Sequence, residues 1–283
     1  MLMNRRIRLV AFFLSSLTLP LWGCGPGDSG GTGGGGGGGP EVTELKFTGG
    51  PPAKPRFSPD DTLIAYVQSA DAGEELGVMT VAGEDRKNLG PAGGYLSAPA
   101  WSPDGETLYF TSDDGIKSIP AAGGTAEVVV TEFATTDPDV SADGTRLVFA
   151  QNGGPLRLVD LATPDMPQDL GTSGFSPRFS PDGKKIVYQS GFDLKIMDLA
   201  SGDVTDVLDT GNYLASADWL PEGDRLAAIT DDGIEILTLG EGAPERELIS
   251  DQFAAKDIDV SADGKSIVYA VNGQSSIFVL TGF

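Results

Sequence analysis

Histidine is absent from this sequence, and cysteine occurs once, at Cys24. Without histidine the chain cannot form a Ser-His-Asp triad or a histidine-ligated metal site. A single cysteine excludes an intrachain disulfide, so the fold must be held by packing alone. Paired carboxylates could still serve a glycosidase, but nothing in the sequence marks an acid with a raised pKa. We therefore expect no enzyme activity, no catalytic residue and no cofactor.

Basic residues are scarce. Lysine and arginine total 19 against 41 aspartates and glutamates, which gives a formal charge of −22. Such a surface repels phosphate backbones and anionic lipid head groups, so nucleic acid is not an expected partner. The same charge favours solubility and a monomeric body.

The N-terminus has the pattern of a secretory signal. Residues 1–8 are short and basic, and residues 10–21 form an apolar run that is too short to span a bilayer. The run ends in Leu21-Trp22-Gly23-Cys24, and a glycine-rich segment follows up to Pro40. Side chains that could build a core are almost missing there, so residues 24–40 are predicted to be a flexible tether.

The segment Leu21-Trp22-Gly23-Cys24 resembles a bacterial lipobox. The resemblance implies that residues 1–23 are a signal peptide, that cleavage precedes Cys24 and that Cys24 is lipidated. A lipid anchor would then be the expected attachment to the membrane. Gly25 after the cysteine implies an outer-membrane lipoprotein facing the periplasm or exposed at the surface. The alternative is an ordinary secretory signal followed by an unmodified cysteine.

One short motif recurs six times. Its best-formed copy is Phe-Ser-Pro-Asp-Gly at residues 179–183. The six copies begin at Phe57, Trp101, Val140, Phe179, Trp219 and Val260. A period of about forty residues with one tight turn per unit is the signature of a β-propeller blade.

Each copy has the chemistry of a turn between two strands. Ser, Pro, Asp and Gly are favoured at successive positions of a type I turn, and glycine accepts the positive φ that follows. Asp61 replaces the glycine in the first copy and tolerates the same conformation. Segments rich in β-branched and aromatic residues follow every turn. We therefore predict an all-β, six-bladed propeller of four-stranded antiparallel blades over residues 41–283.

The last blade lacks a fourth strand, whereas an extra strand precedes the first blade. The third strand of the last blade is expected at 277–280, and residues 42–48 have the character of an outer strand. Pairing these two segments would complete the sixth blade and close the ring without an open edge.

The repeats resemble those of the TolB-like propeller family, which carry a Pro-x-Phe/Trp-Ser-Pro-Asp-Gly core. The segments at 55–61, 99–105 and 177–183 fit this pattern closely, and the other three copies are degenerate. The resemblance covers residues 41–283. It implies a six-bladed ring that meets a protein partner through one of its faces.

Charged residues are expected to line the central channel of this ring. The residue before each motif, and the residue two positions earlier, should alternate away from the blade core. The candidate binding residues are Lys54, Arg56, Asp137, Asp139, Arg178, Asp218, Asp257 and Asp259. With six blades, Arg56 should face Arg178 across the channel and Asp139 should face Asp259. We interpret the set as a binding site at one channel mouth; alternatively, the charges satisfy one another and water.

A calcium site is a further possibility, because Asp137, Asp139, Asp257 and Asp259 offer oxygen ligands. Opposed blades are far apart for shared ligation, and no stretch fits an Asp-x-Asp-x-Asp-Gly loop. We therefore predict no metal site.

The expected role is that of a lipid-anchored envelope propeller that binds another envelope protein at the charged channel mouth. The alternative is a small-ligand or carbohydrate receptor that uses the central channel. A purely structural envelope protein is the third class.

Overall fold

The computed structural model describes residues 39–71, 73–91, 96–132, 135–151, 154–209, 216–252 and 254–283. The predicted signal peptide, Cys24 and nearly all of the predicted tether lie outside these residues. Within the described ranges, no helix is long and apolar enough to cross a membrane.

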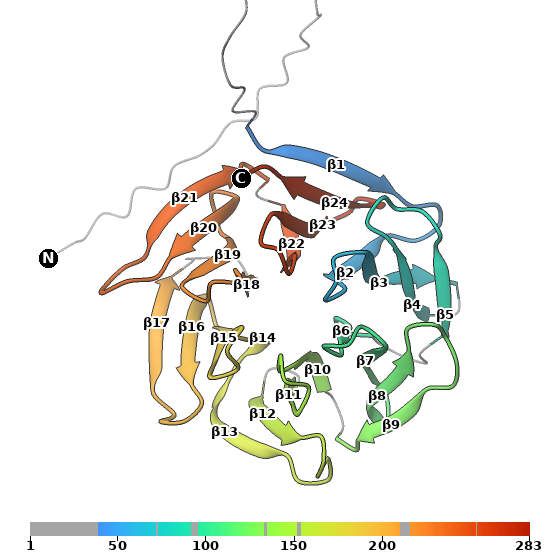
Figure 1. Cartoon of the computed structure of the whole chain (residues 1–283), viewed down its shortest axis with the longest axis horizontal. Coiled ribbons are helices and arrows are strands. Elements are labelled where there is room, and N and C mark those ends of the chain that lie inside the picture. The colour runs from blue at the N-terminus through green and yellow to red at the C-terminus, as the bar shows by residue number, and fades with distance from the viewer. Residues whose placement is uncertain are drawn as a thin grey trace, which may run out of the picture. The chain divides into compact units, whose positions relative to one another are not determined.

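The described chain forms six four-stranded antiparallel sheets, which are arranged as the blades of a ring (Figure 1). This confirms the predicted six-bladed all-β propeller. Blade 1 contains β2–β5, blade 2 contains β6–β9, blade 3 contains β10–β13, blade 4 contains β14–β17, blade 5 contains β18–β21, and blade 6 contains β22–β24 with β1.

The strands occupy equivalent places in every blade. The innermost strands are β2 (Pro52–Phe57), β6 (Ala100–Trp101), β10 (Thr135–Val140), β14 (Phe175–Phe179), β18 (Ala217–Trp219) and β22 (Ala255–Val260). The second strands are β3 (Leu63–Ala70), β7 (Thr107–Ser112), β11 (Arg146–Gln151), β15 (Lys185–Ser190), β19 (Arg225–Ile229) and β23 (Ser266–Val271). The third strands are β4 (Gly73–Thr80), β8 (Gly115–Pro120), β12 (Pro155–Asp160), β16 (Asp193–Asp198), β20 (Ile234–Thr238) and β24 (Ser276–Thr281). The outer strands are β5 (Lys87–Pro91), β9 (Glu127–Val130), β13 (Gln168–Ser173), β17 (Val204–Asp209), β21 (Glu245–Ser250) and β1 (Glu41–Lys46).

The ring is closed by β1, as the sequence predicts. It pairs antiparallel with β24, with Val42 opposite Leu280 and Leu45 opposite Ile277. Beyond the strand, the Phe47 N–H donates to the Ser275 carbonyl over 2.8 Å. The first strand of the ring therefore supplies the outer edge of the last blade, and this edge joins the two ends of the fold.

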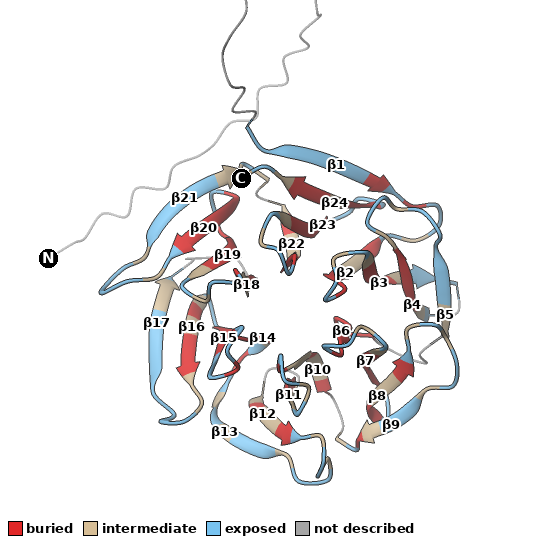
Figure 2. Ribbon diagram, viewed as in Figure 1, coloured by how far each residue is buried: buried red, intermediate tan, exposed pale blue. Residues whose placement is uncertain are grey.

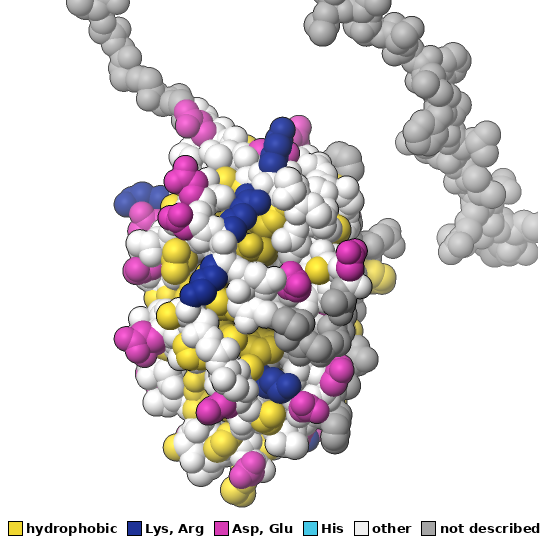
Figure 3. All heavy atoms as spheres, turned by 90° about the vertical axis from the view of Figure 1, so that its right-hand side faces the viewer, with side chains coloured by type: hydrophobic (Ala, Val, Ile, Leu, Met, Phe, Trp, Pro, Cys, Tyr) yellow, Lys and Arg dark blue, Asp and Glu magenta, His cyan; other side chains and the backbone are white. Residues whose placement is uncertain are grey.

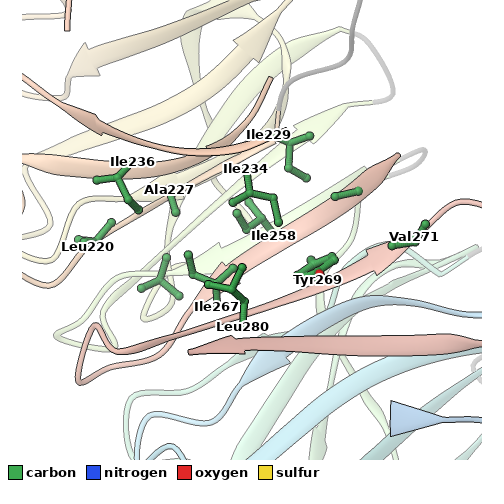
Figure 4. Close-up of a cluster of buried hydrophobic side chains, with 12 residues drawn as sticks. Leu220, Ala227, Ile229, Ile234, Ile236, Ile258, Ile267, Tyr269, Val271 and Leu280 are labelled. Atoms are coloured by element: carbon green, nitrogen blue, oxygen red, sulfur yellow. The ribbon is translucent and has the colours of Figure 1, made fainter. Parts of the chain in front are cut away.

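The hydrophobic core is divided among the six interfaces between blades. Buried residues form six separate clusters, and each cluster joins two neighbouring blades. In β23, Ile267 and Tyr269 pack toward blade 5 whereas Val268 packs toward blade 1. Figure 4 shows the blade 5–blade 6 cluster, and Figure 2 shows burial concentrated on the inner three strands of each blade. Both faces of a middle strand are thus apolar, which explains runs such as Ile-Val-Tyr-Ala-Val at 267–271.

The repeated motif forms the turn between the first two strands of a blade. In blade 4, the Gly183 N–H donates to the Ser180 carbonyl over 2.8 Å, and Gly183 has φ of 68°. The Ser180 hydroxyl donates to Asp182 Oδ1 over 2.7 Å and accepts from the Lys185 N–H over 2.9 Å. Asp182 Oδ1 also accepts from the Lys184 N–H over 3.1 Å. Serine and aspartate are therefore favoured here, because together they satisfy the backbone donors of a tight turn.

The serine–aspartate contact recurs in the turns of blades 1, 2, 3 and 6. In blade 5, Leu220 and Glu222 replace the pair, yet Gly223 still donates to the Leu220 carbonyl over 2.9 Å with φ of 78°. The turn geometry thus survives without the side-chain network, because the glycine supplies the conformation.

Asp61 joins the first and last blades. It takes the glycine position of the blade 1 turn with φ of 58°. Its carboxylate accepts from the Ala262 N–H over 2.7 Å and from the Asp263 N–H over 3.0 Å, both in the blade 6 turn. A glycine has no carboxylate and could not make these contacts. Asp61 therefore adds a second connection between blades 1 and 6, besides the pairing of β1 with β24.

We predict that Leu45→Ala lowers the free energy of unfolding by about 2–5 kcal/mol, the usual cost of removing a buried leucine side chain. Leu45 is 4% exposed and packs with Phe57 and Ile64 of blade 1. Urea unfolding followed by circular dichroism measures the change. Val42→Ala is the matched control, because Val42 lies in the same strand and is 51% exposed. Equal losses of unfolding free energy in Leu45→Ala and Val42→Ala would show that the buried face of β1 does not stabilise the ring.

The motif aspartates predict a loss of stability in acid. The Ser141 hydroxyl first, and then the N–H and hydroxyl of Thr145, lower the pKa of Asp143 to about 2. The unfolded pKa is about 3.9. The ionised carboxylate therefore contributes stability above about pH 4, and this contribution disappears as the pH falls toward 2.

Urea titrations of the natural protein and Asp143→Asn at pH 5, 3 and 2 should show their difference in unfolding free energy shrinking with the pH. A difference that stays constant across this range would contradict the assignment.

Candidate functional site

Four innermost strands bend where they line the channel. The pairing of first and second strands shifts register between Ala53 and Arg56 in blade 1, and at the equivalent places in blades 3, 4 and 6. A non-glycine residue with positive φ sits in each bulge: Lys54, Asp137, Ser176 and Asp257, with φ of 55°, 50°, 48° and 54°. This conformation is uncommon for side-chain-bearing residues, and a bulge re-aims the residues that follow it.

After each bulge, a charged side chain points to the ring axis. The Arg178 guanidinium lies 3.3 Å from Asp139 Oδ1 and 3.4 Å from Asp259 Oδ1. Arg56 Nε lies 3.6 Å from the same Asp259 oxygen. The set Arg56, Asp139, Arg178, Asp218 and Asp259 is called the axial cluster below.

The axial cluster differs from a ring of charges facing one another across open space. Arg178 reaches Asp259 two blades away, so side chains bridge the axis at this level. Arg56 and Arg178 are each 5% exposed and Asp259 is 7% exposed. Oppositely charged groups are thus paired around Arg178 and Asp259, whereas Asp218 takes part in none of these ion pairs.

Each axial aspartate also fastens the next blade. Asp139 Oδ2 accepts from the Phe179 N–H over 2.8 Å, and Asp259 Oδ2 accepts from the Phe57 N–H over 2.8 Å. Asp218 Oδ2 accepts from the Val260 N–H over 2.9 Å. One oxygen of each carboxylate thus accepts a hydrogen bond from the next blade, and the other oxygen is left for contacts in the channel.

The axial contacts repeat after three blades. The Trp101 indole N–H donates to the Arg56 carbonyl over 3.1 Å, and the Trp219 indole N–H donates to the Arg178 carbonyl over 3.2 Å. Asp139 and Asp259 occupy matching positions in the two halves, as do the two arginines. The exception is Asp218, whose counterpart in blade 2 is Ala100.

Burial and like charges shift the pKa values in the cluster. Desolvation, followed by the neighbouring charge of Asp218, raises the pKa of Asp259 to about 7. Desolvation also raises the pKa of Asp139, despite the attraction of Arg178. The pKa of Arg56 is lowered, first by burial and then by Arg178. Burial acts to lower the pKa of Arg178 too, but Asp218, Asp139 and Asp259 together outweigh it and raise that pKa. Carboxyl groups outnumber guanidinium groups at this level, and the raised pKa values of Asp139 and Asp259 reduce the excess of negative charge.

A cavity of about 280 Å³ lies on the axis at the end of the ring where the repeated turns are found. Its charged lining is Asp139, Arg178, Asp218 and Asp259, and its apolar lining includes Phe57 and Trp219. Turn residues from four blades complete the lining: Pro59, Ala142, Pro181 and Ala262. These four are exposed, so they form the rim of the opening.

The eight predicted channel residues fall into two layers. Four of them line the cavity, and Arg56 is buried beside it against Asp259. Lys54, Asp137 and Asp257 precede the axial residues by two positions, and they do not belong to the cavity lining. Lys54 Nζ donates to the Leu96 carbonyl over 2.7 Å, and the Ser176 hydroxyl donates to Asp137 Oδ2 over 3.3 Å. Four of the eight predicted binding residues therefore line the cavity at the turn-bearing end of the channel.

No group of three or more acidic side chains within the described ranges is placed to hold a metal ion. The four aspartates considered for calcium belong to different layers, and two of them are committed to Arg178.

Sequence reasoning missed the two tryptophans as axial hydrogen-bond donors and the turn residues as the rim of the cavity. The signal for the tryptophans was present, because Trp101 and Trp219 begin the second and the fifth copies of the motif, which lie three blades apart.

The repeats of this chain match a known family of β-propellers. Residues 42–189 match the TolB beta propeller domain. Over 147 residues the chain is 29% identical to the uncharacterized peptidase YuxL of Bacillus subtilis (strain 168), a match that covers 48% of this chain and 21% of that protein. Over 76 residues it is 37% identical to the Tol-Pal system protein TolB of Alcanivorax borkumensis, covering 26% of this chain and 18% of that one. The chain thus spans about a fifth of the length of these curated relatives.

Among solved structures, the crystal structure of TolB from Acinetobacter baumannii matches with a TM-score of 0.59 and 18% sequence identity. The match covers 82% of this chain and 63% of that chain. At this identity the likeness shows a shared fold.

We predict that the Asp259 carboxyl titrates near pH 7 and that Asp218→Asn lowers its midpoint, because the change removes a neighbouring negative charge. Carbon-13 NMR of the aspartate side-chain carboxyls between pH 3 and 9 measures the Asp259 midpoint in the natural protein and in Asp218→Asn. Asp165→Asn removes an exposed aspartate elsewhere and should leave the Asp259 midpoint in place. An Asp259 midpoint that does not respond to Asp218→Asn would show that the two carboxylates are not coupled.

Proposed function

Because the chain belongs to the TolB β-propeller family, we propose that it is a cell-envelope module that binds another protein at the turn-bearing end of its ring. The observation that carries this proposal is the axial cavity, which is charged at its floor and rimmed by exposed residues of four blades. A rigid ring presents such a rim without having to order loops on binding, which lowers the cost of association.

Charge gives this end of the ring its selectivity. The axial cluster is fixed by ion pairs and by hydrogen bonds to the backbone of the next blade, so its charges are preorganised. Complementary charges on a partner would steer its approach and set its orientation. One of the matched relatives is named a Tol-Pal system protein, and this name supports an envelope setting for the present chain.

The predicted lipid anchor belongs to the same proposal. Lipidation of Cys24 would place the ring at the end of the tether predicted for residues 24–40, within reach of proteins near an outer membrane. Mass analysis of the mature protein should find acyl chains on Cys24. An intact N-terminal signal would exclude the anchor while leaving the binding surface unaffected.

The second candidate is a receptor for a small ligand or carbohydrate in the same cavity. The observation in its favour is the mixed lining, in which Phe57 and Trp219 accompany three carboxylates and a guanidinium. The volume of about 280 Å³ lies just below the range of about 300–1,000 Å³ that is usual for small-molecule pockets. The protein-binding role therefore stands first.

Site-specific photo-cross-linking in native envelopes tests the protein-binding role. We expect a photoreactive residue at Ala142 or Ala262, on the rim of the cavity, to capture a defined protein. The same residue at Met166, which is 77% exposed and is not part of the cavity lining, should not capture it. Equal capture from all three positions, or none from the rim, would overturn the proposal. A thermal shift with free sugars that needs the intact cavity, without cross-linking at the rim, would favour the second candidate.

A further inference from the structure

Asp218 differs from the other axial aspartates in its surroundings. Asp139 and Asp259 each form an ion pair with Arg178. Within the part of the chain that the structure describes, Asp218 takes part in no ion pair, although its charge acts on Arg178, and its Oδ2 accepts a hydrogen bond from the Val260 N–H. The opposite blade has Ala100 at the equivalent position, so this carboxylate has no matching partner across the axis.

The axial cluster contains one more negative group than positive groups. The cluster has two guanidinium groups and three carboxyl groups. Two positions earlier in the strands there is one lysine, Lys54, and there are two aspartates, Asp137 and Asp257. Buried charge is costly when it is not compensated. Arg56, whose side chain is 6% exposed, also has no hydrogen-bond acceptor for its buried Nε–H, which lies 3.6 Å from Asp259; this donor is outside the cavity lining, so an entering cation would leave it unchanged. The residues present therefore do not satisfy one another fully.

The cavity gives access to this unbalanced charge from the turn-bearing end. Asp218 is half-buried in the cavity wall, and the lining of the cavity also includes the buried residues Trp219 and Phe179. Aromatic surface beside a carboxylate suits a long side chain that has an apolar stem and a cationic end. Figure 3 shows the side of the ring that carries β4, β5, β8 and β9, where acidic and basic side chains are scattered among apolar atoms.

We propose that the axial pocket receives a lysine or arginine side chain of the partner protein, with Asp218 as its ion-pair acceptor. The inference rests on the proposed protein-binding function and specifies its chemistry. The entering cation supplies a positive partner for Asp218, and its stem packs against the part of the cavity wall that Phe179 and Trp219 contribute. Since the pocket holds one long side chain, a single basic residue of the partner is the anchor, and the exposed turns contact its surroundings.

A model peptide tests the proposal on the full-length protein. The probe is N-acetyl-Gly-Arg-Gly-amide, and its neutral counterpart carries citrulline, which has nearly the same shape without the charge. Nitrogen-15 NMR follows the Val260 amide, which is hydrogen-bonded to Asp218. We expect the arginine peptide to shift this amide saturably and the citrulline peptide to bind at least about tenfold more weakly, as befits the loss of one charge-assisted contact.

Two variants complete the test. Asp218→Asn keeps an oxygen that can accept from Val260 and should raise the dissociation constant of the arginine peptide about tenfold or more. Asp165→Asn removes an exposed charge elsewhere and should leave binding unchanged. If Asp218→Asn fails to fold, the arginine–citrulline comparison on the natural protein still decides. Equal binding of the two peptides, or no shift of the Val260 amide, would overturn the proposal. So would a response of that amide to calcium chloride alone.

The outcomes separate this inference from the function on which it rests. Cross-linking at Ala142 and Ala262 without arginine binding would retain the protein-binding role and remove the cationic anchor. Arginine binding without any cross-linked protein would remove the protein-binding role instead.

Discussion

Every blade of this ring is apolar on both faces, and this constraint governs the rest of the structure. Ile267 and Val268 are neighbours in one strand, yet they belong to clusters on opposite sides of the same sheet. A blade with one neighbour would therefore expose half of its core. Six shared interfaces remove that exposure only if the last blade meets the first. The pairing of β1 with β24 and the Asp61 contacts to the blade 6 turn are consequences of this requirement.

The sequence predicts the architecture well because the architecture is built from local, repeated chemistry. The Ser-Pro-Asp-Gly turns, their spacing and the unmatched strand at residues 42–48 are sufficient to predict six blades and their closure. The structure sets the closing strand at Glu41–Lys46, within two residues of that expectation. Asp61 illustrates the limit: its tolerance of positive φ is readable from the sequence, whereas its bonds to Ala262 and Asp263 depend on a turn some 200 residues away.

The candidate site is less predictable because side-chain reach decides it. Alternation along the strands predicts eight residues toward the axis, and four of them, Asp139, Arg178, Asp218 and Asp259, line the axial cavity. It cannot show that Arg178 extends far enough to contact Asp259 two blades away, or that Lys54 and Arg56 lie in different layers. The bulges at Lys54, Asp137, Ser176 and Asp257 were also hidden, since no glycine marks them. Their conformations are held by the surrounding sheet, and they aim the charged residues that follow.

The axial cluster connects stability with recognition. Each of its aspartates uses one carboxylate oxygen to hold the next blade, which leaves the other for the channel. Removing a carboxylate entirely would disturb both roles, whereas an amide in its place separates them. This division explains how charged groups can be buried at the centre of a small ring: the backbone of the neighbouring blade supplies part of their solvation.

The near-repetition of the two three-blade halves has a consequence for anything that approaches along the axis. After half a turn, an incoming molecule would meet a different wall, because Arg178 and Trp219 line the cavity whereas their counterparts Arg56 and Trp101 do not. The difference between Ala100 and Asp218 adds a second asymmetry. The repeated strands thus offer a bound molecule two unequal orientations about the ring axis.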